Sequence, residues 1–292
     1  KNRLSVFASA ANTDRDSYYG PGNDPLKAYG KTTDLTAMGG AQYVHTFDKC
    51  FFMPSDLTAG LEYNRDRLKD NMWGYNRHTD QTVNIYSAFL QNEWKNDRWG
   101  ILIGGRLDKH NMVDNVIFSP RANLRFNPTQ NINLRLSYSS GFRAPQAFDE
   151  DMHIENVGGT VAMIERAKDL KEEKSQSFSV SADMYHRFGA FQTNLLIEGF
   201  YTRLTDVFVL GKPYDRGDGI LVKTRSNGPG AKVMGLTLEG KVAYLSILQI
   251  QAGLTLQRSR YDEPHKWHDD APAEKKIFRT PDTYGYFTAT YT

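Results

Sequence analysis

The residues best suited to hold a metal ion lie in one acidic segment, Asp149-Glu150-Asp151-Met152-His153-Ile154-Glu155. Closely spaced carboxylates are the usual ligands of Ca²⁺, so this segment could form a calcium site. Its spacing matches neither an EF-hand nor any other calcium loop that can be defined from sequence. Two hypotheses therefore stay open: a loop that binds Ca²⁺ through Asp149, Glu150 and Asp151, or a solvated acidic loop with an incidental His153.

A second polar segment, residues 262–276, contains His265, Trp267, His268, Asp269 and Asp270. Its histidines and aspartates are metal-ligand types, but the spacing fits neither a closed zinc site nor a zincin helix. We favour a polar loop in which Trp267 packs or contacts a ligand. Three other aromatic residues predicted to lie in loops could stack on a planar ring system or simply pack: Tyr18, Tyr19 and Tyr214.

Catalytic chemistry finds little support in the sequence. No G-x-S-x-G nucleophile motif occurs. The glycine-rich segment Asn227-Gly228-Pro229-Gly230 has neither of the phosphate-loop patterns and is typical of a turn before a strand. The sequence therefore predicts a protein that is not an enzyme.

Composition narrows the class of protein. Hydrophobic residues make up 39% and charged residues 24% of 292 residues, and the mean hydropathy is −0.58. No segment approaches the roughly 18 uninterrupted apolar residues of a transmembrane helix. A net charge of +2 gives no argument for nucleic-acid binding. The single cysteine, Cys50, excludes an internal disulfide and is expected to be a small buried residue near a turn.

Period-2 alternation dominates the chain and predicts strands. Alternation of apolar and polar residues covers residues 57–63, 116–126, 132–139, 177–184, 234–244 and 248–256. No stretch of comparable length has helical periodicity, so the predicted fold class is all-β. The clearest run places Phe178, Val180, Ala182 and Met184 on one face and Ser177, Ser179, Ser181 and Asp183 on the other.

Short and long connections alternate between the predicted strands. The short ones are residues 48–55, 95–98, 127–130, 188–191 and 245–247. The long ones are residues 12–31, 67–79, 109–115, 144–174, 210–231 and 262–276. This pattern predicts about twelve antiparallel strands in up-and-down order, with every long loop at one end.

Three features favour a transmembrane β-barrel over a soluble β-sandwich such as a carbohydrate-binding domain. The predicted strands run about ten to fifteen residues, beyond the usual soluble length of about five or six. Short turns at one end and long loops at the other are typical of outer-membrane barrels. The apolar faces end in aromatic residues, where an interfacial girdle would lie: Tyr63, Trp94, Phe126, Tyr138 and Tyr244. The polar faces, which would line a wet lumen, carry Arg121, Arg125, Arg135, Glu198, Glu239 and Lys241.

Three ordered motifs carry a family resemblance. They are Ser119-Pro120-Arg121-Ala122 followed by Phe142-Arg143-Ala144-Pro145, then Asp169-Leu170-Lys171, and then Gly235-Leu236-Thr237-Leu238-Glu239. In this order, and on predicted strands, they resemble the TonB-dependent outer-membrane receptors. The second motif departs from the family's pattern, because its usual leading Asn-Pro is missing.

The resemblance implies an active uptake receptor in a Gram-negative outer membrane. Residues 1–292 would be a partial barrel domain of a receptor with about twenty-two strands, whose plug domain, signal peptide and last strands lie outside this sequence. The implied partners are outer-membrane lipid, the TonB-ExbB-ExbD complex acting through the plug, and a surface lipoprotein. The alternative from another class is a passive porin or adhesin barrel.

The resemblance also indicates cargo and site residues. The loop that begins Phe142-Arg143-Ala144-Pro145 is similar to loops of cobalamin and haem receptors, and a siderophore is the alternative chelate. Haem receptors of the family ligate iron with a histidine between the Phe142–Pro145 motif and the Asp169-Leu170-Lys171 motif, the interval that holds His153. Cobalamin receptors of the family bind Ca²⁺ in their extracellular loops. Arg143 itself is expected to be structural, with its guanidinium forked onto carbonyls or carboxylates at the rim. The predicted ligand-binding residues are His153, Asp149, Glu150, Asp151, Trp267 and Tyr214.

Overall fold

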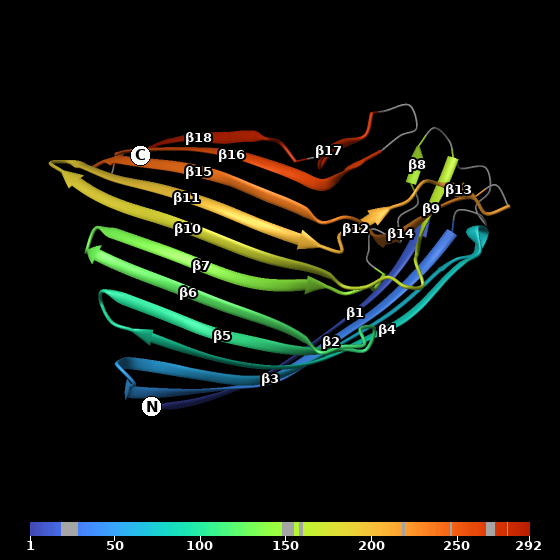
Figure 1. The fold of residues 1–292 in the computed structure, drawn as a ribbon, viewed down its shortest axis with the longest axis horizontal. Helices are drawn as coiled ribbons and strands as arrows, with labels where there is room; N and C mark the ends of the chain where they lie inside the picture. Colours follow the sequence, from blue (N-terminus) through green and yellow to red (C-terminus); the bar gives the residue numbers. More distant parts are fainter. Residues whose placement is uncertain are drawn as a thin grey trace.

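A computed structural model of the chain describes residues 1–18, 29–147, 155–157, 160–217, 220–245, 247–266, 272–278 and 280–292. Most of them form one large antiparallel sheet (Figure 1). Its strands are β1 (Asn2–Tyr18), β2 (Tyr29–Cys50), β3 (Met53–Met72), β4 (Arg77–Lys95), β5 (Trp99–His110), β6 (Ile117–Thr129), β7 (Ile132–Arg143), β10 (Glu173–Phe188), β11 (Phe191–Thr205), β15 (Ala231–Tyr244), β16 (Leu248–His265), β17 (Glu274–Lys276) and β18 (Thr283–Tyr291).

Sequential neighbours pair throughout this sheet, which confirms the up-and-down order. Because β17 and β18 both pair with β16, they share one position, and the sheet has twelve strand positions. Within the described residues, β1 and β18 each have one neighbour, so the sheet forms an open, curved wall (Figure 1). In the same part of the chain, no helix is long and apolar enough to cross a membrane.

A second, small sheet is built from the two longest connections. Its order is β12-β14-β9-β8, with β13 also paired to β14, and β14 runs parallel to β9. It lies at the end of the large sheet where the long connections gather, which we call the loop end (Figure 1). Its strands are β8 (Glu155–Val157), β9 (Thr160–Arg166), β12 (Phe208–Leu210), β13 (Tyr214–Asp215) and β14 (Leu221–Asn227).

The register of the large sheet separates an apolar outer face from a polar inner face, because successive side chains point to opposite sides. On the outer face Leu61, Leu136 and Val180 are 66%, 52% and 58% exposed. Apolar area of this extent is exposed only where a membrane or a partner covers it. On the inner face Arg106 pairs with Glu62 at 2.6 Å and with Asp108 at 2.8 Å.

Aromatic residues close the apolar band of the outer face at both ends, as expected. Near the turns, the rings of Trp99 and Phe126 stack with centroids 4.2 Å apart. Toward the loop end, Tyr138 meets Phe178 at 4.7 Å. Amphipathic rings at two levels of one face are the arrangement that membrane–water interfaces favour.

Two sequence-based expectations about loops and burial were wrong. The segment 67–79 is mostly strand rather than a long loop, because β3 and β4 pair up to Met72 opposite Arg77. Only the 3-10 turn η1 (Trp73–Tyr75) and Asn76, with φ of 47°, connect them. Cys50 lies at a turn, as expected, but is half-buried rather than buried.

The face assignment predicts the outcome of one matched pair of substitutions. Val180 points outward near the middle of β10, and its neighbour Ser181 points inward, opposite Glu198. Val180→Arg should destabilise the full-length protein by about 1–2 kcal/mol, because it places a charge in the apolar band, one row below the aromatic residues of the interface. Urea unfolding in lipid vesicles measures this cost. Ser181→Arg should cost much less, and equal costs would refute the assignment of the faces.

Candidate functional site

The small sheet is anchored on the tip of the β3–β4 hairpin by an apolar cluster. Met72 and Tyr75 from the hairpin pack against Met163 of β9 and Ile220 before β14. Met72 and Met163 are each 1% exposed, and burial raises the pKa of the Tyr75 hydroxyl. The cluster therefore holds β9 and β14 over one corner of the loop end.

A buried ion pair fixes the hairpin tip beneath this cluster. Arg77 Nη2 lies 2.7 Å from Asp70 Oδ2, and these side chains are 10% and 3% exposed. The Thr32 hydroxyl donates to the other carboxylate oxygen at 2.6 Å. These partners satisfy the charge of Asp70, which burial would otherwise disfavour.

Gln81 of β4 joins the hairpin to two segments distant in sequence. Its Oε1 accepts from the Ala147 N–H at 2.8 Å and from Arg166 Nη1 at 3.0 Å. Arg166 Nη1 also donates to the Pro145 carbonyl at 2.9 Å. One side chain thus ties together β4, the end of the Phe142–Pro145 motif and β9.

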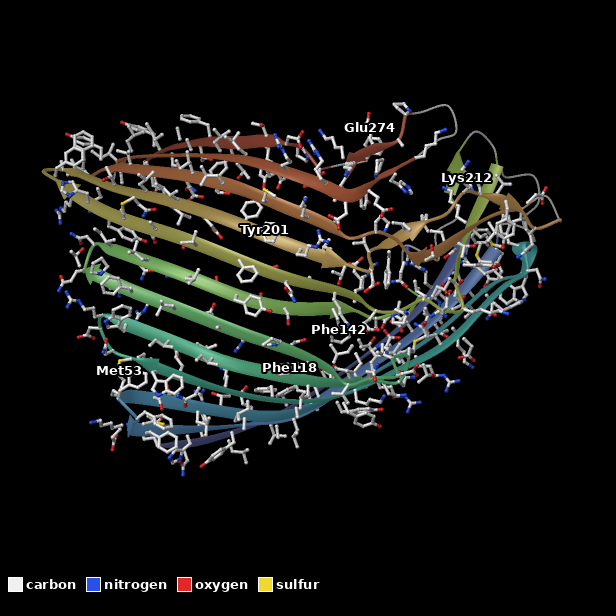
Figure 2. The ribbon with its side chains drawn as sticks, in the orientation of Figure 1. Met53, Phe118, Phe142, Tyr201, Lys212 and Glu274 are labelled. Carbon is white, nitrogen blue, oxygen red and sulfur yellow. The ribbon has the colours of Figure 1, made fainter. Side chains whose placement is uncertain are left out.

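The Phe142–Pro145 motif itself acts as a packing element at the loop end of β7 (Figure 2). Ala144 is buried in a cluster with Val113 and Ile117, against which Phe142 packs. The Arg143 guanidinium carbon lies 5.4 Å from the centre of the Phe208 ring, within range of a cation–π contact. The structure thus places this arginine over an aromatic ring of β12, where it links β7 to the small sheet.

His110 is a fully buried residue that the sequence analysis missed. Its Nδ1 accepts the Met112 N–H at 3.0 Å, and its Nε2 lies 3.2 Å from Gln146 Oε1. An accepting Nδ1 requires the neutral ring with the proton on Nε2, which then donates to Gln146. His110 therefore joins the backbone at Met112 to the side chain of Gln146, the residue after the Phe142–Pro145 motif. Its position at the end of a strand gave no signal of this role.

These contacts surround a cleft of about 660 Å³ between the start of β4 and β9, which we call the loop-end cleft. The volume is within the range of small-molecule sites. Two motif residues, Pro145 and Leu170, contribute to its lining. Positive charge predominates in the lining, which has one acidic residue, Glu165, and four basic residues: Arg77, Arg166, Lys168 and Arg216.

The charge of the cleft is suited to an anion. Asp70 pairs with Arg77. The contacts of Arg166 include the Gln81 side chain, and those of Arg216 include the Tyr75 carbonyl at 2.8 Å. Lys168 is exposed and makes no hydrogen bond or ion pair within the described part of the chain. A concave surface with one sign of charge attracts ligands of the opposite sign.

The structure describes only some of the predicted ligand-binding residues. Tyr214 is 48% exposed in β13 and does not line the loop-end cleft. Asp169 is exposed in the turn before Leu170. Among the described residues, no group of three or more His, Cys, Asp or Glu could hold a metal ion. The remaining predicted residues lie outside the described part: Asp149, Glu150, Asp151, His153 and Trp267, together with Tyr19.

Two further residues considered in the sequence analysis, Tyr18 and His265, can be placed. Tyr18 packs on Tyr29 with ring centroids 5.3 Å apart, and Tyr29 stacks on Trp73 at the same distance. His265 lies 6.0 Å from the Tyr261 ring. Of the two alternatives for Tyr18, stacking on a ligand or packing, the contact with Tyr29 supports packing for one side of the ring.

The buried pair at the hairpin tip yields a prediction about local stability. Asp70→Ala should lower the free energy of opening the tip by about 3–5 kcal/mol, because it removes the carboxylate that pairs with the buried Arg77 guanidinium. Hydrogen exchange of the β3 and β4 amides measures this opening. The double variant Asp70→Ala/Arg77→Ala should recover part of the loss.

The control is an exposed pair on the same hairpin, Lys69 and Asp80, whose charged atoms lie 3.7 Å apart. Lys69→Ala should cost less than about 1 kcal/mol, since exposed pairs are solvent-screened. If Asp70→Ala opens the tip no more than Lys69→Ala, the buried pair does not hold it.

Comparison with known proteins agrees with this architecture. The chain is 23% identical over 206 residues to a probable haemoglobin and haemoglobin-haptoglobin-binding protein 3 of Haemophilus influenzae, a match covering 69% of this chain and 18% of that protein. It is similar to the siderophore receptor PirA from Acinetobacter baumannii, with a TM-score of 0.67, 16% identity, and 97% and 44% of the two chains covered. The FrpB iron transporter from Neisseria meningitidis (F5-1 variant) gives a TM-score of 0.66 with 16% identity over 98% and 48%.

The chain thus spans less than a fifth of the curated relative's length and under half that of these two solved structures. At such identities the structural likeness shows the fold. The family model described as TonB dependent receptor-like, beta-barrel matches residues 2–292. The chain belongs to the TonB-dependent receptor β-barrel family.

Proposed function

We propose that the full-length protein imports an anionic iron chelate across a Gram-negative outer membrane, with haem as the preferred cargo. The observation that carries this proposal is the basic lining of the loop-end cleft, where Arg166, Lys168 and Arg216 outnumber Glu165. In this scheme the loops capture the chelate, and the TonB-ExbB-ExbD complex supplies the energy for its passage.

The positive charge of the cleft favours haem over cobalamin, the other cargo that the sequence indicates. Haem carries two propionates, and guanidinium and ammonium groups bind carboxylates through charge-assisted hydrogen bonds. The rim of cobalamin is mostly neutral amides, for which a basic cleft offers no comparable gain. Haem therefore ranks above cobalamin. The similarity to a haemoglobin-binding protein supports the same order.

Lys168 is the best residue for a test of this proposal, because it lines the cleft but makes no hydrogen bond or ion pair within the described residues. Lys171 lies in the same exposed segment, but it does not line the cleft. Lys168→Glu should weaken haem binding about tenfold, which corresponds to about 1.4 kcal/mol. Lys171→Glu should leave the affinity within about twofold of the wild type.

The measurement is a titration of the full-length protein in detergent with haem and with cyanocobalamin, followed by visible absorption. A Soret shift that His153→Ala abolishes would support an imidazole ligand to haem iron. Tight cobalamin binding that is indifferent to Lys168→Glu would overturn the haem proposal. If neither compound binds, an anionic ferric siderophore becomes the cargo to test.

A further inference from the structure

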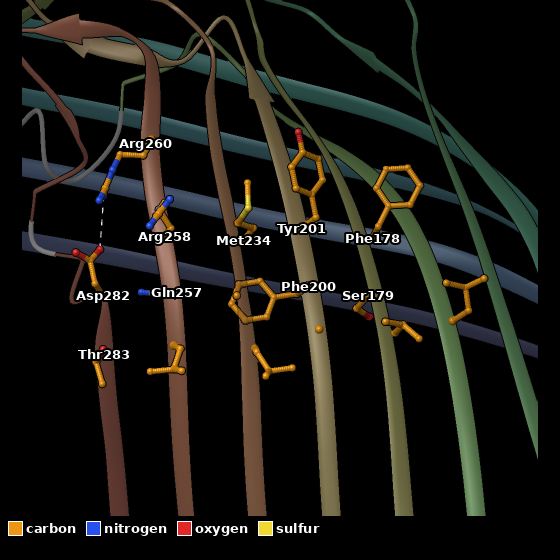
Figure 3. A pocket seen from close by; sticks show the side chains of 16 residues that line it. Phe178, Ser179, Phe200, Tyr201, Met234, Gln257, Arg258, Arg260, Asp282 and Thr283 are labelled. Carbon is orange, nitrogen blue, oxygen red and sulfur yellow. Dashed lines mark ion pairs between the residues drawn. The ribbon is translucent and has the colours of Figure 1, made fainter.

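A wide apolar groove of about 780 Å³ runs across the outer face, from β7 to β18, below the loop end (Figure 3). Its central row consists of paired neighbours on successive strands: Leu136, Val180, Gly199, Leu236, Leu256 and Thr283. Gly199 has no side chain, which leaves a hollow between Val180 and Leu236 that a larger residue would fill.

The hollow at Gly199 is not required by the backbone. A Cβ built on Gly199 would lie 3.6 Å from Val180 Cγ1, an ordinary van der Waals contact. The residue lies in a regular strand, where β-branched residues are favoured. A glycine inside a strand often marks a bulge, a tight bend or a place where a ligand approaches the backbone closely. The register is regular on both sides of Gly199, which argues against a bulge.

The next row toward the loop end is aromatic and then basic. Phe178, Tyr201, Met234 and Arg258 are consecutive partners across β10, β11, β15 and β16 (Figure 3). Aromatic side chains at this height mark the membrane–water interface. Arg258 therefore lies at the level of lipid head groups, directly beside the apolar groove.

The row above adds further positive charge, part of which is already neutralised. Asp262 holds Arg203 through both carboxylate oxygens, at 2.7 and 2.6 Å. Asp282 lies 3.6 Å from Arg260 and 2.8 Å from Lys276.

Arg258 and Lys232 differ from these neighbours in having no such partner. Neither side chain makes a hydrogen bond or ion pair within the described ranges. An exposed guanidinium and an ammonium beside a lipid-facing groove are therefore available to an anionic head group.

We propose that this groove binds one phosphorylated, multiply acylated glycolipid of the outer leaflet. Its acyl chains lie over Gly199 and the neighbouring aliphatic residues, and a phosphate accepts hydrogen bonds from Arg258, with Lys232 alongside. The proposal rests on the outer-membrane location proposed above. Six strand positions span about 24 Å, which is wider than the two chains of a phospholipid require.

The test uses full-length protein purified in mild detergent from native outer membranes. Lipid mass spectrometry measures the phosphorylated glycolipid and the phospholipid retained per protein. Arg258→Gln should reduce the retained glycolipid about tenfold, because it removes a charge-assisted contact. Gly199→Val, which fills the hollow, should reduce it several-fold and leave the barrel folded.

Two matched controls separate a specific site from a general change of charge or shape. Lys241→Gln removes a positive charge from the inner face, opposite Asn194. Gly240→Val adds a side chain to an outer-face glycine that does not line the groove and whose Cβ would meet nothing within 4 Å. Both should retain the wild-type amount of glycolipid.

Each outcome decides the proposal. If Arg258→Gln and Gly199→Val keep the wild-type amount of glycolipid, the site does not exist. If they lose phospholipid instead, the occupant is a two-chain lipid and the glycolipid assignment is wrong. Haem titration of the same preparations keeps the two proposals separate, because a wild type that retains glycolipid but binds no haem refutes only the cargo.

Discussion

The constraint on which this structure depends is that a backbone in hydrocarbon must satisfy its own hydrogen bonds. The ladder that runs from β1 to β18 does so by pairing each strand with its sequence neighbour. Pro120, which has no N–H, shows how the ladder limits residue choice. It lies opposite Gly105 of β5, one residue before pairing with β7 begins at Arg121. The missing donor therefore falls at the margin of the β6–β7 ladder.

Once the ladder is set, each side chain has only two directions, and the two environments sort the sequence. Leu136 and Val180 face outward, while Arg106 and Glu62 form an ion pair inside. The same alternation places Gly199 and Arg258 on the lipid side, at adjacent heights. A groove with a charged end thus arises from the strand period, the cross-strand register and the missing side chain of Gly199.

The fold class, the strand order and the two faces could be predicted because a period of two is a local property of the sequence. The hairpin tip could not, since Asp70, Arg77 and Gln81 are polar residues of the kind that usually indicates a loop. They are buried by partners that the local pattern does not show: Gln81 bonds to Ala147, 66 residues later. The small sheet was missed for the same reason, because its parallel pairing of β9 with β14 joins two separate connections.

The loop-end cleft shows why family motifs indicate architecture better than cargo. Ala144 packs in a core, Pro145 accepts a hydrogen bond from Arg166, and Leu170 lines the cleft. These residues position the wall, and a wall of this kind can serve many chelates. Most of the positive charge comes from Arg166, Lys168 and Arg216, which belong to no motif and lie in or beside the small sheet. If the proposed anionic cargo binds in this cleft, selectivity depends on contacts distant in sequence, which local motifs cannot indicate.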